Sequence, residues 1–303
     1  MLSNQHTLKK AYYFQGRGLH TGTYAHMKLL PAPVDTGISF RRTDLRGKPQ
    51  IWAVAENVSN TARSTTLSHR ETVAVTVEHI LSALTGLGVD NAFIELDNIE
   101  VPILDGSARP FVEAILKDGL EDQGEPRHYI DIPHTLEIRD EGSGSWIRIE
   151  PAPAPSADVT VDFGSKILGI QQIHWDENVN YAHEIGICRT FVFFHEIEYL
   201  YRNNLIKGGD VDNAIVIVEH PVDEEQLSSI ANLFNYPDIH ITDEGYLNNI
   251  QLHFPDECGR HKMLDLLGDM RLAGGFLNAH ITAFKPGHSI NTKTAKALRA
   301  LIR

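Results

Sequence analysis

The chain has 303 residues, 42% of them hydrophobic, which is enough for a sizeable core, and its two cysteines exclude a disulfide framework or a cysteine-based zinc site. The formal net charge of −13 opposes nonspecific binding to nucleic acid, which requires a basic surface. We find no secretory signal and no apolar run of the ~18 residues that a transmembrane helix needs, so we expect a cytoplasmic protein without stable membrane insertion.

The first part of the chain predicts short strands followed by two helices. Glycines and prolines divide residues 8–58 into strands and turns. Thr76 is predicted to cap a helix over 77–85, which two glycines end. A strand is expected over 92–96. A second helix is expected over 110–117, because its apolar residues repeat at helical spacing.

A polar segment, residues 118–127, is interpreted as a linker between an N-terminal domain, 1–127, and a C-terminal domain, 128–303. In the second half, strands are expected around 130–139, 146–150, 158–163, 214–218 and 281–284, and helices around 191–203, 257–272 and 292–302. Both halves mix strands with helix pairs, which indicates an α+β fold. The tetrapeptide Val-Asp-Asn-Ala occurs in each half and is a weak sign that the halves are similar.

The helix predicted over 257–272 contains the most informative polar pattern. His261, Asp265 and Asp269 follow one another at intervals of four residues, which places them on one face of a largely apolar helix. A buried histidine and aspartate one turn apart either bond to each other or share a cation. Zn²⁺ accepts both ligand types, but the sequence of this helix alone leaves both interpretations open.

A second candidate is the pair Glu78 and His79 in the first turn of an apolar helix. Neighbouring helical side chains point about 100° apart, so one can bind a metal while the other meets the water bound to it. A hydrolytic zinc site needs that division: three protein ligands, one open position and a base. The tetrapeptide 76–79 taken alone favours the alternative, an exposed acid beside a hydrogen-bonded histidine.

Two further residues fit such chemistry. His288 follows a Pro-Gly turn after a strand and is expected at a loop tip, where Asp269 could hold one ring nitrogen and keep the ring protonated. Thr190 could donate its hydroxyl to an oxyanion. The alternatives are a surface histidine in a turn and a threonine that packs in a strand.

The run His195-Glu196 is similar to the start of a metalloprotease helix. Position 199 is Tyr, however, so the second histidine ligand of that motif is missing. We interpret this run as the solvated face of a helix.

Six motifs, taken together, resemble one family. They are Gly18-Leu-His-Thr-Gly22, Thr76-Val-Glu-His79, Pro102-Ile-Leu-Asp-Gly-Ser107, Arg189-Thr-Phe191, His261-Lys-Met-Leu-Asp-Leu-Leu-Gly-Asp269 and Gly287-His288. In this order, over nearly the whole chain, they resemble the zinc-dependent UDP-3-O-acyl-N-acetylglucosamine deacetylases of lipid A biosynthesis. That family hydrolyses the N-acetyl group of UDP-3-O-(3-hydroxyacyl)-N-acetylglucosamine to acetate and a free amine.

The resemblance implies a role for each candidate. The ligands of Zn²⁺ would be His79, His261 and Asp265, a set that Fe²⁺ would also fit. Glu78 would be the general base. His288, oriented by Asp269, would stabilise the oxyanion or protonate the leaving amine, and Thr190 would complete the oxyanion site.

The resemblance also implies the fold and the substrate contacts. Two similar domains, each a β-sheet layer packed on a pair of helices, would hold the site in the cleft between them. Lys262 would lie near the diphosphate and Phe163 near the uracil. A strand–helix–strand insert near 191–218 would form a passage for the acyl chain, lined by Phe191, Phe193, Ile197, Leu200, Leu205 and Ile206. Packing of an amphipathic helix would produce the same apolar pattern.

Residues 219–253 are similar to the branch of the family that is fused to a hydroxyacyl-carrier-protein dehydratase, a domain that these 303 residues do not include. Three other functions compete with the deacetylase. They are another zinc amidohydrolase, a UDP-sugar- or lipid-binding protein with a structural zinc, and an α+β protein without metal. A structural zinc is closed by four protein ligands, whereas three are found here with an acid beside one of them, which favours catalysis.

Overall fold

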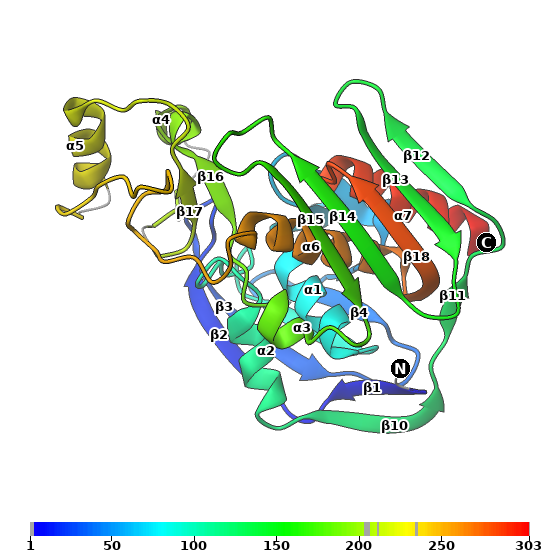
Figure 1. Cartoon of the computed structure of the whole chain (residues 1–303). Helices are drawn as coiled ribbons and strands as arrows, with labels where there is room; N and C mark the ends of the chain where they lie inside the picture. Colours follow the sequence, from blue (N-terminus) through cyan, green and yellow to red (C-terminus); the bar gives the residue numbers. More distant parts are fainter. Residues whose placement is uncertain (1–2, 203–206, 211, 234–235, 303) are drawn as a thin grey trace.

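The computed structural model describes residues 3–202, 207–210, 212–233 and 236–302. Within these residues it confirms the predicted α+β class, because sheets of five and six strands pack against helices. Figure 1 shows the helices α1 (Glu78–Leu87) and α6 (Glu257–Met270) lying side by side between the two sheets. One continuous hydrophobic core contains residues of both sheets and of these helices.

The five-stranded sheet comes from the first part of the chain. Its strands, in spatial order, are β2 (Tyr12–Arg17), β3 (Tyr24–Pro31), β9 (Ala92–Leu96), β4 (Ile38–Arg42) and β5 (Gln50–Trp52). Residues Ala92, Ile94 and Leu96 of β9 are fully buried while the residues between them are not, the period-two pattern of a sheet with one covered face. A three-stranded sheet of β6 (Val58–Asn60), β7 (Thr66–His69) and β8 (Thr72–Ala74) accompanies it.

The six-stranded sheet comes from the second part. Its strands are β12 (Leu136–Asp140), β13 (Ser145–Pro151), β18 (Phe276–Phe284), β14 (Ser156–Asp162) and β15 (Ile170–Asp176), with β11 (Tyr129–Asp131) also paired to β18. The long helix α7 (His288–Ile302) directly follows β18 and packs with α6 on this sheet. Two shorter helices are α2 (Arg109–Leu116) and α3 (Tyr181–Glu184), near α1.

The segment 118–127, interpreted as a linker, forms a strand for most of its length. Residues Leu120–Pro126 are β10, which pairs antiparallel with β1 (Asn4–Leu8). Hydrogen bonds between the backbones of β10 and β1 hold this segment as a strand, although its polar side chains give it no buried apolar face. The division into domains at residue 127 stays a prediction.

The strands β16 (Phe191–Phe193) and β17 (Ile215–Ile217) pair in parallel and form, with α4 (Phe194–Arg202), the strand–helix–strand insert. The helix predicted over 191–203 therefore begins at Phe194, because the three residues before it pair with β17. Beyond the insert, the described part of 219–253 includes the helix α5 (Glu224–Leu233). Figure 1 shows α4 and α5 standing out from the two main sheets.

The predicted cap at Thr76 is wrong. The helix α1 begins at Glu78, and Val77 occupies its N-cap position. Thr76 has a positive φ of 58°, and its hydroxyl donates to Glu100 Oε1 at 2.7 Å instead of to the helix end. A buried carboxylate on another segment outcompetes the local capping interaction.

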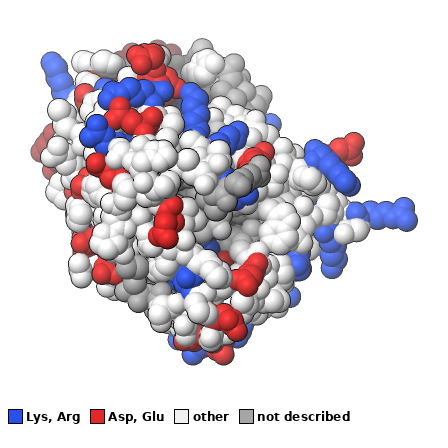
Figure 2. Space-filling view, turned by 90° about the vertical axis from the view of Figure 1, so that its right-hand side faces the viewer, with Lys and Arg blue, Asp and Glu red and all other residues white. Residues whose placement is uncertain are grey.

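Charged side chains of both signs share one face of the molecule (Figure 2). On the face shown in Figure 2, Lys and Arg side chains lie among Asp and Glu side chains. Nucleic-acid binding needs basic side chains gathered on one face, so this mixture does not favour it. In the described part of the chain, none of the helices has the length and apolar character needed to cross a bilayer.

Gly268 of α6 permits the close approach of α6 to α1. A Cβ at this position would overlap the backbone carbonyl of Glu78. We expect Gly268→Ala to lower the free energy of unfolding by about 3 kcal/mol or more, because two backbones, and not a flexible side chain, would have to separate. Urea unfolding measures this. Gly287→Ala is the control, since its Cβ would meet no atom within 4 Å. Equal unfolding midpoints for the two variants would show that the helix contact tolerates a methyl group.

Candidate metal centre and active site

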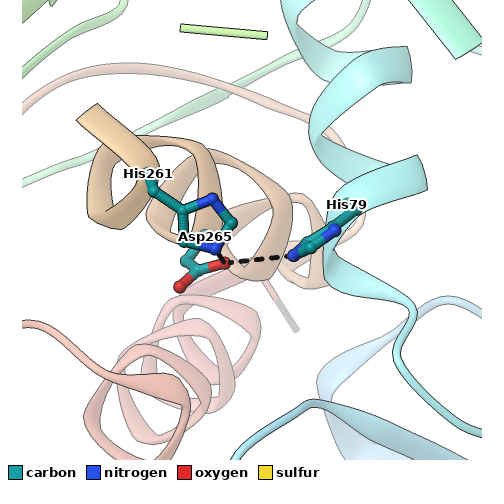
Figure 3. A group of neighbouring side chains, drawn as sticks. All are labelled: His79, His261 and Asp265. Atoms are coloured by element: carbon teal, nitrogen blue, oxygen red, sulfur yellow. Dashed lines mark ion pairs between the residues drawn. The ribbon is translucent and has the colours of Figure 1, made fainter. Parts of the chain in front are cut away.

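The contact between α1 and α6 brings three predicted ligands together (Figure 3). His79 Nε2 lies 3.8 Å from Asp265 Oδ1, and His261 Nε2 lies 3.5 Å from the same oxygen. All three ligand atoms lie within 4.8 Å of one another, and the residues are at most 5% exposed. Zinc bonds of about 2.0–2.1 Å in a tetrahedron separate ligand atoms by about 3.4 Å. The spacing is therefore close to that of a metal centre.

The hydrogen bonds of these residues leave the inward atoms available. His261 Nδ1 lies 3.0 Å from the carbonyl oxygen of Cys188, so this nitrogen is the donor and Nε2 carries the lone pair. Asp265 Oδ2 accepts from Lys262 Nζ at 2.7 Å, whereas Asp265 Oδ1 is buried without a hydrogen-bond partner. A buried carboxylate oxygen is costly without a partner. A cation between His79, His261 and Asp265 supplies one.

Burial and neighbouring charges give the three residues the protonation states that metal binding requires. It lowers the pKa of His79 to about 3, with a further contribution from His261, and it lowers the pKa of His261 as well. Burial raises the pKa of Asp265, but the Lys262 ammonium group, with contributions from the neighbouring histidines, outweighs it and holds that pKa well below its ordinary value. Neutral imidazoles and an ionised carboxylate are the forms that bind a divalent ion.

Glu78, the first residue of α1, lies beside this centre. Its side chain is buried, and Oε2 accepts a hydrogen bond from the backbone N–H of Thr65 at 3.0 Å. Burial, with Asp269 and Asp265 nearby, raises the pKa of Glu78 to about 8, although His288 opposes the shift. A carboxyl group whose pKa is near neutrality suits proton transfer at physiological pH.

His288 faces Glu78 from the other side, with Nε2 at 3.9 Å from Glu78 Oε1. Its Nδ1 lies 2.9 Å from Asp269 Oδ2, which also accepts from Asn291 Nδ2 at 2.9 Å. Thr65 Oγ1 donates to Asp269 Oδ1 at 2.6 Å. Burial lowers the pKa of His288, but the Asp269 and Glu78 carboxylates outweigh it and raise the pKa to about 9. The ring is therefore cationic at neutral pH.

The expectation that His288 stands at a loop tip is wrong. It is the first residue of α7 and is largely buried, because α7 packs along α6. Thr65 and Asn291 were missed by the sequence analysis. Thr65 donates hydrogen bonds to the carboxylates of Glu78 and Asp269, and Asn291 donates one to Asp269. Neither stands in a motif, and only the folded chain brings them to the site.

A pocket of about 330 Å³ collects most of the predicted site residues. Those lining it are Glu78, His79, Phe163, Thr190, Phe191, Phe193, His261, Lys262, Asp265 and His288. Asp269 is fully buried, and it contacts His288. Leu19 and His20 also line the pocket and stand in the motif 18–22, whereas Arg63 gave no signal in the sequence. Glu196, which was interpreted as part of a solvated helix face, lines the pocket too.

Aromatic side chains form one wall of this pocket. The ring of Phe163 meets those of Phe191 and Phe193 edge-on, with centroids 5.4 and 5.9 Å away. Lys262 Nζ lies 5.4 Å from the centroid of the Phe191 ring while it bonds to Asp265. An exposed aromatic ring and an ammonium group that line the same pocket suit a ligand with a flat ring and an anionic group.

A second pocket, of about 100 Å³, continues from the first into the insert. Both are lined by Leu19, His20, Arg63, Thr190 and Phe191. The second adds mostly apolar residues from β16, α4 and β17, including Val192, Ile197, Leu200 and Val216. An apolar hollow beside the metal centre is thus present where the acyl passage is expected. Leu205 and Ile206 lie outside the described residues.

An α+β protein whose buried His–His–Asp centre adjoins a buried glutamate and a cationic histidine has the layout of a metal-dependent hydrolase. A family model described as LpxC: UDP-3-O-acyl N-acetylglycosamine deacetylase matches residues 5–234 and 236–300. The chain belongs to this family. The resemblance based on its motifs is confirmed.

Curated relatives agree. The bifunctional enzyme LpxC/FabZ of Porphyromonas gingivalis is 41% identical over 100% of this chain and 65% of its own length. The bifunctional enzyme LpxC/FabZ of Bacteroides thetaiotaomicron is 42% identical over 99% of this chain and 65% of its own. The UDP-3-O-acyl-N-acetylglucosamine deacetylase of Thioalkalivibrio sulfidiphilus is 38% identical over 98% of this chain and 90% of its own. The chain thus spans slightly less than two thirds of these bifunctional relatives, whose names agree with the predicted fused branch.

Proposed function

We propose that the protein hydrolyses the N-acetyl group of UDP-3-O-(3-hydroxyacyl)-N-acetylglucosamine, releasing acetate and a free amine for lipid A synthesis. Family membership and the name of the Thioalkalivibrio relative support this substrate. The observation that carries the chemistry is the unpartnered Oδ1 of Asp265, which faces two buried imidazoles beside the buried carboxyl group of Glu78. A binding protein has no need of that buried acid.

The residues that would hold the metal are His79, His261 and Asp265, with Zn²⁺ as the expected ion and Fe²⁺ as an alternative for the same ligands. When bound there, the ion supplies Lewis-acid activation of water and of the amide carbonyl. Two further groups, Glu78 and His288, line the same pocket but are not ligands in this proposal.

The remaining steps are assigned to side chains of this chain. Glu78 takes the proton of the attacking water, and its raised pKa makes it a base matched to neutral pH. His288 faces the developing negative charge as a cation and can protonate the leaving amine. Asp269 fixes its ring through Nδ1. Thr190, which lines the pocket, adds a hydroxyl donor to the oxyanion.

The substrate would extend in two directions from the reacting carbonyl. Lys262 is assigned to the diphosphate and the exposed ring of Phe163 to the uracil. Phe191 and Phe193, which contact Phe163, are assigned to the aromatic wall of the substrate pocket. The acyl chain would enter the hollow of the insert. In this proposal, residues 1–127 supply Glu78 and His79 while residues 128–303 supply the other groups, so the site lies in the cleft between two similar domains.

The pH dependence of the reaction tests the role of His288. Its pKa is raised to about 9, so the cation is present at neutral pH and is lost as the pH rises through about 9. The rate, and the stability that the raised pKa contributes, should both fall on that side. We expect His288→Gln to react slowly and without that alkaline decline. A pH–rate profile measures this, and an unchanged alkaline decline in the variant would exclude His288 as its source.

The direct test is acetate release from UDP-3-O-(3-hydroxyacyl)-N-acetylglucosamine before chelation, after it, and with zinc restored. We expect release that stops on chelation and returns with Zn²⁺. Parallel reactivation with Fe²⁺ compares the two candidate ions. Absence of release by a folded, zinc-loaded protein would reject this substrate, and a panel of other N-acetyl sugars and peptides would then identify the amide.

A further inference from the structure

A second group of metal-binding side chains lies outside the catalytic pocket, on the insert. Strands β16 and β17 are parallel, with Phe193 opposite Ile217. His195, the second residue of α4, and Glu219 each lie two residues after this pair, and His220 is next in the chain. One ligand atom from each of these three side chains lies within 4.8 Å of the others. Figure 1 shows β16, α4 and β17 together in this part of the molecule.

The three side chains are suited to a transition metal by their chemistry. Two imidazoles and one carboxylate form a ligand set that divalent ions such as Zn²⁺ accept, with further positions left for water. His195 and His220 are exposed and Glu219 is half-buried, so the group is accessible. Unlike a cluster of carboxylates alone, it combines one negative charge with two nitrogen donors.

The surroundings hold the rings in place and leave room for the ion. The ring of His195 stacks on that of Phe193, with centroids 5.7 Å apart and planes at 22°. The ring of His220 lies 6.0 Å from that of His195. The three residues line a pocket of about 190 Å³, together with Phe194, Val218, Pro221, Val222, Gln226, Ser229 and Ile230.

We propose that His195, Glu219 and His220 bind a second divalent transition-metal ion, with Zn²⁺ as the ion to test. The site shares no ligand with His79, His261 and Asp265, so it does not depend on the proposed catalysis. The ion would join α4 to the segment after β17, two parts connected through a parallel pair of three-residue strands. The insert would thereby gain a cross-link.

Binding of this ion would also affect the lining of the catalytic pocket. Phe193, which stacks on His195, lines that pocket, and so does Glu196, the next residue of α4. Glu196 is paired with Arg63 at 3.1 Å, and Arg63 lines both the catalytic pocket and the apolar hollow. Fixing His195 would therefore restrain the start of α4, where Glu196 lines the pocket and Ile197 lines the hollow.

The test is the number of Zn²⁺ ions bound per chain after equilibrium dialysis against buffered zinc, measured by elemental analysis. We expect two ions in the unaltered protein and one in His195→Asn and in His220→Asn. Glu219→Gln should weaken the second ion at least about tenfold. His240→Asn is the matched control, because His240 is an exposed histidine beyond the insert that is not part of the group. It should still bind two.

Asp265→Asn separates this proposal from the catalytic one. It should remove one ion while leaving the insert ion in place, and the double variant with His195→Asn should bind none. One ion in the unaltered protein that Asp265→Asn removes would overturn the insert site and leave the catalytic centre standing. A second ion that survives all three insert variants would also overturn it, because that ion would lie elsewhere.

Discussion

Glu78→Gln is expected to lower the rate of acetate release by roughly 10²–10⁴-fold, the usual contribution of a general base, while the bound metal stays at its original level. Glutamine has nearly the same shape and keeps an oxygen for the backbone N–H of Thr65, so the fold should be preserved. It cannot accept the proton of the attacking water. Single-turnover rates and metal content, measured on the same preparation, check both parts.

The matched control for that variant is Glu196→Gln. Glu196 lines the same pocket but is paired with Arg63, and both side chains are partly exposed. Loss of this partly exposed ion pair should change the rate only slightly. A Glu78→Gln enzyme close to the unaltered rate would assign the base to another group, and a variant without metal would make Glu78 part of the metal site.

Asp265→Ala is expected to lose the metal ion of the His79, His261 and Asp265 centre and, with it, activity by at least roughly 10²-fold, because the Lewis acid contributes several kcal/mol to the transition state. The substitution removes the oxygen that faces both His79 and His261. It also leaves Lys262 without the carboxylate that it contacts at 2.7 Å. Metal analysis after dialysis, together with the rate of acetate release, measures the effect.

Folding must be separated from metal loss in that experiment. Removing one partner of a buried ion pair costs about 3–5 kcal/mol, so Asp265→Ala can also destabilise the protein. Asp265→Asn keeps the size and part of the hydrogen bonding, and Asp256→Ala, at the N-cap of the same helix, is the control that should retain the metal. Folded Asp265→Asn and Asp265→Ala that both kept the full metal content of the unaltered protein would remove Asp265 from the ligand set.

Several parts of the site could be predicted because they depend on local periodicity. The four-residue spacing of His261, Asp265 and Asp269 determines that they share a helix face, whichever tertiary contacts that helix makes. The adjacency of Glu78 and His79 likewise determines that their side chains diverge, so one can be a ligand and the other a base. The structure shows both features: Glu78, His79, His261 and Asp265 line one pocket. Asp269 contacts His288, which lines the same pocket.

Local patterns were misleading where a distant group competes. Thr76 has the residue type of a helix cap, yet the Glu100 carboxylate takes its hydroxyl. The polar segment 118–127 has the composition of a loop, yet pairing with β1 makes most of it a strand. His288 follows a Pro-Gly turn, yet packing of α7 on α6 buries it. In each case the deciding energy comes from a partner far away in the chain.

The amino-acid sequence by itself determined the family, the α+β class and the types of side chain at the centre, because motif order, periodicity and residue chemistry are local properties. The tertiary structure alone decided that His79 meets His261 and Asp265, since this depends on the contact of α1 with α6 at Gly268. It also decided that His195 lies close to Glu219 and His220, because the pairing of β16 with β17 brings the start of α4 near the segment after β17. Contacts of this kind depend on how segments distant in the sequence pack together, and no short-range sequence pattern specifies that packing.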